Sequence, residues 1–343
     1  MEVRLSDIKI EPVLDSVFRK KISDEVYFSD EYREYISNSR LKLINPDQNG
    51  TPSTYKQGFS SKKTHSLFLG SKIHECCLQP EEFSIGPDYD KPTGKLGLVI
   101  DEVIKLRKQH WLIKDAILEA CKRIDYYQGY ITTSRIKTII KTGLKYYLKA
   151  YHHEDDSQCL LSSKDRATVL NCLNNLQHRD VQNVLYPKDL FGDNITFYNE
   201  DAFFIDFKCT YENKSSIIKF KMKADNWTID FENKVITLND LKTTGHLVTQ
   251  FMSKSWIDYH YARQFSLYLY VILRYCEKEY GYNSDEWAFK CNVIVVETTG
   301  ENRVQVFPIG KDLLAPGKTE FCKLLKMVGY CEMCDYSDDI TFI

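Results

Sequence analysis

The chain has 343 residues, of which 43% are hydrophobic, and a formal net charge of −2. This length allows one large domain or two ordinary ones. The near-zero charge excludes a general attraction to nucleic acid, so any polyanion must be bound by a local patch. No apolar run reaches the roughly 18 residues of a membrane-spanning helix, and the N-terminus lacks the apolar run of a secretory signal.

The first half of the chain is predicted to be mainly helical. Residues 1–34 mix charges with weak hydrophobic periodicity, so we expect an N-terminal appendage there. The segment 35–186 carries apolar residues at helical spacing, interrupted by loops such as 82–98, which contains Gly and Pro. We expect helices over about 37–44, 67–78, 111–121, 134–151 and 162–178.

The spacing of apolar residues changes after Pro187 from helical to alternating. We expect strands over about 202–207, 217–220, 227–231, 235–241, 293–296 and 304–307, and helices over about 256–280 and 311–327. This order predicts an α/β fold with a central mixed sheet, flanking helices and a helical N-terminal half. Residues 35–343 would form a single domain, with the α/β core in 187–343.

Two acidic residues stand near a predicted strand pair. Asp225 lies at the end of the preceding strand, and Asp240 lies on the strand over 235–241, two residues before Lys242. Because side chains alternate along a strand, Asp240 and Lys242 share a face, while the carbonyl of Leu241 lies between them. Asp225 could reach the same point.

Such a group can bind a hard divalent cation. Mg²⁺ takes one or two carboxylates and fills its other positions with phosphate oxygens and water. The cation would polarise the phosphate and lower the pKa of its water, which Lys242 could orient or deprotonate. The alternative is a solvated charge pair, which is what an Asp-x-Lys sequence at a strand end usually forms.

The same residues resemble the PD-(D/E)xK nuclease superfamily, specifically its RecB-like and RecE (exonuclease VIII)-like phage branch. Ala224-Asp225 fills the PD position, with Ala in place of Pro, and Asp240-Leu241-Lys242, followed by two threonines, fills the (D/E)xK position. Three further segments are similar to that branch, and the resemblance covers roughly residues 35–310. They are the short helix at 37–42, the histidine motif at 70–83 and the helix motif Gln264-x-x-x-Tyr268.

The resemblance implies a restriction-endonuclease-like core and a metal site. His74 would join Asp225, Asp240 and the Leu241 carbonyl as a ligand, although a lone His on a helix face is more often a packed or surface residue. Imidazole beside carboxylates would favour Mg²⁺ or Mn²⁺. Related nucleases often place a helper acid upstream of the PD position, and Glu200 is the candidate; a solvated loop residue is the alternative.

The resemblance also implies a function. Gln264 and Tyr268, four residues apart on one helix face, would hold a nucleic-acid phosphate or orient Lys242, whereas ordinary helix packing would explain them equally. The implied activity is metal-dependent hydrolysis of DNA to 5′-phosphates by a phage-type exodeoxyribonuclease in recombination or DNA processing. A single-strand annealing protein is the usual partner of that branch, and a homo-oligomeric ring could wall the cleft.

Two other functions stay open. A non-catalytic DNA-binding or assembly protein could keep a degenerate nuclease fold. An iron–sulfur RecB-like nuclease of CRISPR adaptation or repair would need one N-terminal and three C-terminal cysteines. Cys331 and Cys334 form a CxxC pair, with Cys322 shortly before it and Cys76 and Cys77 far upstream. The cysteine that usually follows such a pair is missing from residues 335–343, which argues against a cluster. The 11 scattered cysteines suit free thiols in a reducing cytoplasm, that of the host if a phage encodes the chain.

A basic stripe is predicted on the helix over 134–151. Its members recur every four residues and so share one side of the helix. Such a stripe could follow a DNA backbone, although a charged stripe is usually only a solvated helix face. The residues are Lys137, Lys141, Lys145 and Lys149.

Overall fold

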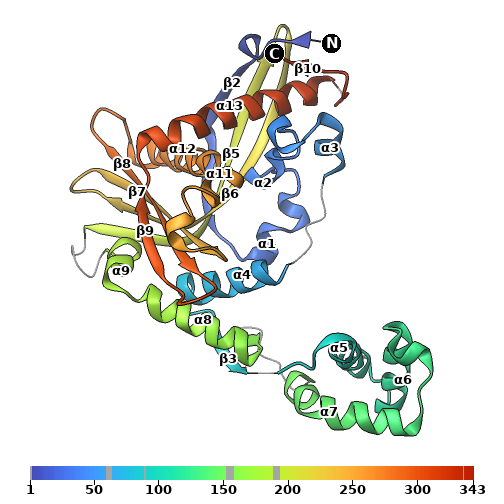
Figure 1. The fold of residues 1–343 in the computed structure, drawn as a ribbon. Coiled ribbons are helices and arrows are strands. Elements are labelled where there is room, and N and C mark those ends of the chain that lie inside the picture. Colours follow the sequence, from blue (N-terminus) through green and yellow to red (C-terminus); the bar gives the residue numbers. More distant parts are fainter. Residues whose placement is uncertain (1, 59–63, 89, 152–157, 188–193, 335) are drawn as a thin grey trace. The chain divides into compact units, whose positions relative to one another are not determined.

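The computed structural model describes residues 2–58, 64–88, 90–151, 158–187, 194–334 and 336–343. The chain forms two compact units (Figure 1). Unit 1 comprises residues 1–79 and 172–343, and unit 2 comprises residues 80–171. This division differs from the single domain expected for residues 35–343, because each unit buries a hydrophobic core of its own.

Unit 1 is built on a six-stranded sheet in the order β2-β5-β6-β7-β8-β9. Strands β7 and β8 pair in parallel and all other neighbours are antiparallel, so the sheet is mixed, as predicted. A short parallel pair joins the two ends of the chain. The strands are β1 (Glu2–Val3), β2 (Lys9–Lys21), β5 (Ile195–Tyr211), β6 (Lys214–Asp230), β7 (Val235–Thr244), β8 (Ala288–Glu297), β9 (Val304–Pro308) and β10 (Thr341–Phe342).

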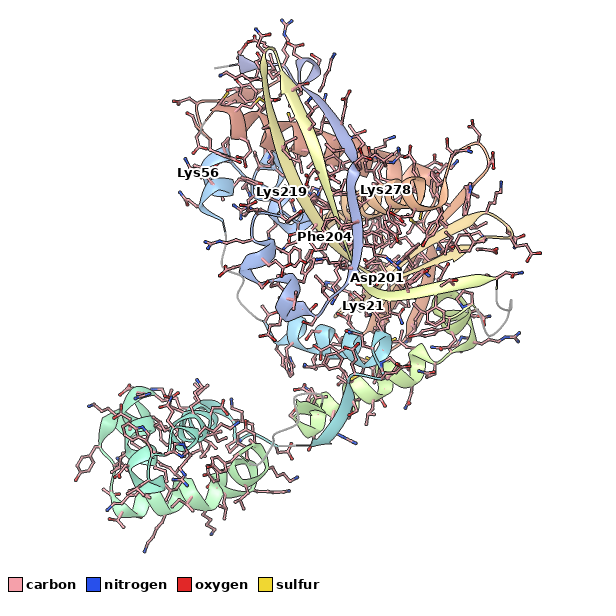
Figure 2. The ribbon with its side chains drawn as sticks, turned by 180° about the vertical axis from the view of Figure 1, so that it is seen from behind. Lys21, Lys56, Asp201, Phe204, Lys219 and Lys278 are labelled. Atoms are coloured by element: carbon pink, nitrogen blue, oxygen red, sulfur yellow. The ribbon has the colours of Figure 1, made fainter. Side chains whose placement is uncertain are left out.

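Two long helices, α12 (Tyr261–Tyr280) and α13 (Lys311–Cys334), cover one face of β2, β5 and β6. Phe203 of β5, Phe265 of α12 and Phe321 of α13 are buried in one cluster there. Burial of such large apolar side chains, at roughly 25 cal/mol per Å², is the main stabilisation of this layer. Lys278 of α12 also donates to the backbone carbonyls of Asp15 and Val17 on β2, beside the strands shown in Figure 2.

The opposite face of β5 and β6 is covered by the segment that follows β2. Phe204 points to the other side of its strand from Phe203, and it packs with Tyr27 and Tyr32 (Figure 2). Lys221 of β6 donates to the carbonyls of both tyrosines. Residues 1–34 were expected to be an appendage; instead they supply an edge strand and a cover for the sheet. Short elements of this region are α1 (Asp24–Tyr27), α2 (Asn38–Leu41) and α3 (Pro52–Gln57).

Unit 2 is helical, as expected for this part of the chain. Helices α5 (Gly94–Lys108), α6 (Ile113–Arg123) and α7 (Thr133–Tyr151) bury their apolar stripes against one another. The segment 82–98, expected to be a loop, instead contains β3 (Ser84–Asp88), which pairs in parallel with β4 (Gln158–Leu161). Helix α8 (Ser163–Leu176) begins in this unit and ends in unit 1.

Several predicted elements are continuous or divided in the structure. The strands expected at 217–220 and 227–231 are parts of one strand, β6, because Lys221, Lys223 and Asp225 interrupt the apolar pattern without ending the strand. The helix expected over 256–280 is divided into α11 (Ser255–Asp258) and α12. No helix among the described residues is long and apolar enough to cross a membrane.

Candidate metal centre

The pairing of β6 with β7 stops at Asn226 and Asn239. Beyond this pair, the N–H of Leu241 on β7 is bonded to a side chain of β6. It donates a hydrogen bond of 2.8 Å to the carboxylate of Asp225. The two strands therefore separate at this point, and the side chain of Asp225 bridges the opening. Asp240 and Lys242 precede and follow the bridged residue, and their side chains form an ion pair, which agrees with the shared strand face that alternation predicted.

The pairing of β5 with β6 is interrupted at the same level. Asn199 pairs with Asn226 and Asp201 pairs with Ala224, but Glu200 and Asp225 between them are not paired. Glu200 has a φ of 55°, a left-handed conformation that costs a non-glycine residue about 1 kcal/mol or more. The side-chain alternation changes here, because Ala224 and Trp227, three residues apart, both face the same core. This kink directs the two carboxylates toward one another.

His74 reaches the carboxylates from α4 (His65–Leu78). This helix is capped by Thr64, whose side chain accepts from the N–H of Leu67. Gly70 allows α4 to approach β7, because a Cβ at this position would lie only 2.9 Å from the hydroxyl of Thr243. The approach places Nδ1 of His74 3.5 Å from Oδ2 of Asp225.

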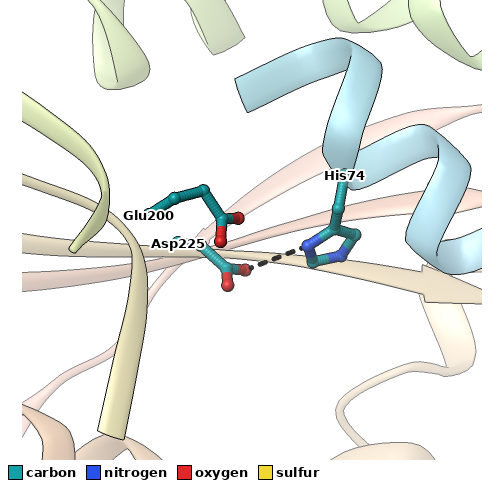
Figure 3. Close-up of side chains that lie close together, drawn as sticks. All are labelled: His74, Glu200 and Asp225. Carbon is teal, nitrogen blue, oxygen red and sulfur yellow. Dashed lines mark ion pairs between the residues drawn. The ribbon is translucent and has the colours of Figure 1, made fainter. Parts of the chain in front are cut away.

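His74, Glu200 and Asp225 form a group whose ligand atoms all lie within 4.8 Å of one another (Figure 3). The backbone of Leu241 lies beside the imidazole of His74, where it opposes the lowering of the pKa of the ring by burial. The structure thus brings together three of the five proposed ligands, and it places the backbone of Leu241, another of the five, beside them. Glu200, which the sequence left open between a helper acid and a loop residue, lies inside this group.

Asp240, which was also expected to be a ligand, is not a member of this group. Its side chain is only 3% exposed and forms an ion pair with Lys242. Gln264 of α12 donates to its other oxygen at 3.1 Å. The ammonium of Lys242 also lies 5.3 Å from the ring centre of Tyr261, within the range of a cation–π contact.

Burial shifts the ionisation of the centre. It raises the pKa of Glu200 and Asp225, whose charges also oppose one another, and it raises the pKa of Asp240 to about 6 despite the nearby ammonium of Lys242. Burial lowers the pKa of His74. A neutral imidazole has the free electron pair that a metal ligand needs.

Lys242 behaves differently from the acids. Burial alone would lower its pKa, but the charges of Asp240 and Asp225 raise it above the ordinary value of a lysine. Lys242 is therefore a cation at neutral pH. Burial also raises the pKa of Tyr268 well above its ordinary value, and Tyr27, Asp240, Asp225 and Glu200 add to the shift, so its hydroxyl keeps its proton beside the carboxylates.

A second lysine was missed by the sequence interpretation. Lys223 lies 3.0 Å from Glu200 and 2.6 Å from Asp24, and its side chain is 13% exposed. It follows Lys221 and precedes Asp225 at the alternate-residue spacing of one strand face. That spacing was the available signal, but it was hidden because residues 221–226 were not expected to be part of a strand.

A ladder of four asparagine side chains, of which Asn226 and Asn239 are fully buried, was also not predicted. Asn239 donates to Asn226 at 2.7 Å and accepts from Asn292 at 2.8 Å, and Asn226 donates to Asn199 at 2.7 Å. The ladder crosses four strands beside the residues that carry the acids. Further amide hydrogens bond to the carbonyls of Val184 and Leu185 on α9 (Arg179–Leu185). A connected buried network of this kind fixes the strands on which the carboxylates are placed.

The remaining predicted residues lie elsewhere in the chain. The basic stripe is on α7 of unit 2; Lys137, Lys141 and Lys145 are exposed there, and DNA contact stays a prediction. Cys322, Cys331 and Cys334 all lie on α13. Within the described part of the chain, the one group of three or more metal-ligand side chains is that of His74.

The residues of this group suit a divalent cation. One imidazole nitrogen and two carboxylates supply a mixed nitrogen and oxygen set, which suits Mn²⁺ or Mg²⁺ with water and substrate oxygens in the other positions. Two acids with raised pKa values beside each other would repel one another without a cation. The polar chemistry of the group therefore fits the predicted metal.

We compared the chain with protein families, curated proteins and solved structures. No protein-family profile matches the chain, and no curated protein matches it. Among solved structures, the chain is similar to a crystal structure of a candidate exonuclease from Eubacterium rectale, with 10% sequence identity and a TM-score of 0.41. The likeness covers 90% of this chain and 85% of that one. We draw no inference about family or activity from a likeness with this score.

Proposed function

We propose that this protein is a metal-dependent deoxyribonuclease of the PD-(D/E)xK type that hydrolyses phosphodiesters to 5′-phosphates. The observation that supports it most is the convergence of His74, Glu200 and Asp225 within 4.8 Å. Asp225 is bonded to the N–H of Leu241, the residue between Asp240 and Lys242. Four distant segments of sequence thus meet where the resemblance places a nuclease site.

The side chains can be assigned separate tasks. A cation held by His74, Glu200 and Asp225 would polarise a bound phosphate and lower the pKa of a water molecule. The ammonium of Lys242 can hold a phosphate oxygen or the attacking water and stabilise the negative charge of the transition state. Its raised pKa favours this role over that of a general base. Gln264 fixes the carboxylate of Asp240, which in turn holds Lys242.

The finer parts of the proposal come from the sequence resemblance. It supports DNA as the substrate, an exonuclease and a role in phage-type recombination or DNA processing. The site contains three buried acids, which would repel a phosphate. A phosphate would therefore be held there by the cation and by the ammonium of Lys242. A phosphodiester would therefore bind weakly when the metal is removed.

Digestion of linear and circular DNA in Mn²⁺ or Mg²⁺ tests the proposal. We expect loss of linear DNA that EDTA stops and that Lys242→Ala abolishes. Lys234→Ala is the matched control, since Lys234 lies in the turn before β7 and pairs with Glu286 outside the site. Binding of DNA without digestion in any metal would instead support a non-catalytic protein with a degenerate site.

A further inference from the structure

The chain bends sharply between α11 and α12, beside the candidate centre. Tyr259 follows α11 and is 64% exposed, and the next residue, His260, has a left-handed φ of 53°. A non-glycine residue adopts this conformation only where the surrounding structure holds it. The bend is therefore a built feature, and it sets the position of the tyrosine ring.

Glu320 of α13 holds the bend in place. Its Oε1 lies 2.8 Å from Nδ1 of His260 and 2.8 Å from Nη1 of Arg263 on the first turn of α12. Arg263 is buried and also donates to Asn38 and Gln48. These contacts come from three separate segments, so the backbone at Tyr259 is fixed before any ligand arrives.

The ring of Tyr261 lies between the exposed ring of Tyr259 and the ammonium of Lys242. The centres of the Tyr259 and Tyr261 rings are 5.7 Å apart, and the ammonium of Lys242 is 5.3 Å from the Tyr261 ring centre. Burial raises the pKa of the Tyr261 hydroxyl, although the neighbouring ammonium of Lys242 opposes the shift. Tyr261 itself is packed against Phe251 and Trp256, which leaves Tyr259 as the outer ring.

We propose that Tyr259 is a stacking platform for an unpaired nucleobase next to the phosphodiester in the centre. This assignment rests on the proposed function, and it makes single-stranded DNA, or a single-stranded end, the preferred substrate. Both faces of a base inside a duplex are covered by its neighbours, so only an unpaired base can lie against the ring. Stacking on aromatic side chains binds single strands with little dependence on sequence.

Fluorescence of a single-stranded oligodeoxynucleotide with one 2-aminopurine tests the platform directly. The probe base is moved along the strand, and binding is measured in EDTA and in Ca²⁺, with cleavage monitored on a gel. We expect quenching at one or two neighbouring positions and roughly tenfold weaker binding by Tyr259→Ala, a typical effect for one stacking ring. Tyr259→Phe should bind like the wild type, since it keeps the ring.

Ile257→Ala is the matched control, because Ile257 lies on α11, two residues before Tyr259, and is also 64% exposed. It should change neither binding nor quenching. Absence of quenching in the wild type, equal quenching in Tyr259→Ala, or equal quenching by a blunt duplex would each overturn the platform. DNA hydrolysis that does not depend on Tyr259 would overturn it and leave the proposed function standing. Tyr259-dependent quenching without any hydrolysis would support the platform and remove the nuclease.

Discussion

The carboxylate of Asp225 accepts a hydrogen bond of 2.8 Å from the backbone N–H of Leu241, at the level where β6 and β7 stop pairing. One side chain thus has two tasks. It satisfies a buried backbone donor, and it offers a ligand to the group formed with His74 and Glu200. These two tasks can be separated by substitution.

Asp225→Asn should remove metal binding and keep the fold. The amide oxygen can still accept from Leu241, whereas the anionic ligand is lost. We expect activity to fall more than about a hundredfold, beyond the effect of groups that only support a ligand. Asp225→Ala should also lower the free energy of unfolding by about 1–3 kcal/mol, since the N–H is left unpaired. Urea unfolding measures this difference. Asp230→Asn, on the same strand but outside the group, is the control for both.

Mn²⁺ should raise the melting temperature of the wild-type protein. A ligand that binds only the folded state stabilises it by about 2.7 kcal/mol at a hundred times its dissociation constant. The expected shift is several degrees in differential scanning fluorimetry, and EDTA should reverse it. An equal shift in Asp225→Asn would show that the ion binds elsewhere.

Metal affinity should fall as the pH is lowered. Burial raises the pKa of Glu200 and Asp225 and raises that of Asp240 to about 6, so these acids take up protons at a higher pH than ordinary carboxyls. Protons and the cation then compete as the pH falls through about 6, where Asp240 takes up its proton, and the affinity should fall further at lower pH. Calorimetry of Mn²⁺ binding in buffers of different ionisation enthalpy should show proton release near pH 6 and less at pH 8. Affinity independent of pH from 5 to 8 would contradict the metal site.

Asn239→Ala should destabilise the protein although Asn239 contacts no proposed ligand side chain. The substitution leaves buried partners on Asn226 and Asn292 without a hydrogen bond, at a cost of about 2 kcal/mol or more. Chemical denaturation measures the loss. Asn213→Ala, in the exposed turn between β5 and β6, should have little effect. If both variants unfold alike, the amide ladder does not fix the strands.

The central strands of the sheet could be predicted from their alternating apolar residues, but the edge strand β2 could not. Strand β2 contains Pro12 and several charged residues, and its pairing with β5 shifts register between Val13 and Phe18. Such a strand has no regular alternation, so residues 1–34 showed no signal. The separate unit 2 was also missed. Apolar stripes on α5, α6 and α7 indicate that each helix is buried, but they do not indicate against which partner.

The site was predictable where a local rule applied. Alternation placed Asp240 and Lys242 on one strand face, and helix spacing placed Gln264 and Tyr268 on one face of the next long helix. Only the family resemblance assigned Gln264 and Tyr268 to the site. Glu200 could only be named as a candidate, because its position depends on a left-handed backbone that glutamate rarely adopts. Lys223 and the asparagine ladder depend on pairing between strands, which a single sequence does not specify. The functional roles of all these residues stay predictions.

Anomalous diffraction from crystals containing Mn²⁺ tests the central claim most directly, because it locates the ion. We expect one strong peak within bonding distance of His74, Glu200 and Asp225, and no peak at this point in Asp225→Asn. A wild-type crystal with saturating Mn²⁺ and no peak there, or with its peak at another place, would contradict a metal-dependent nuclease centre in this protein.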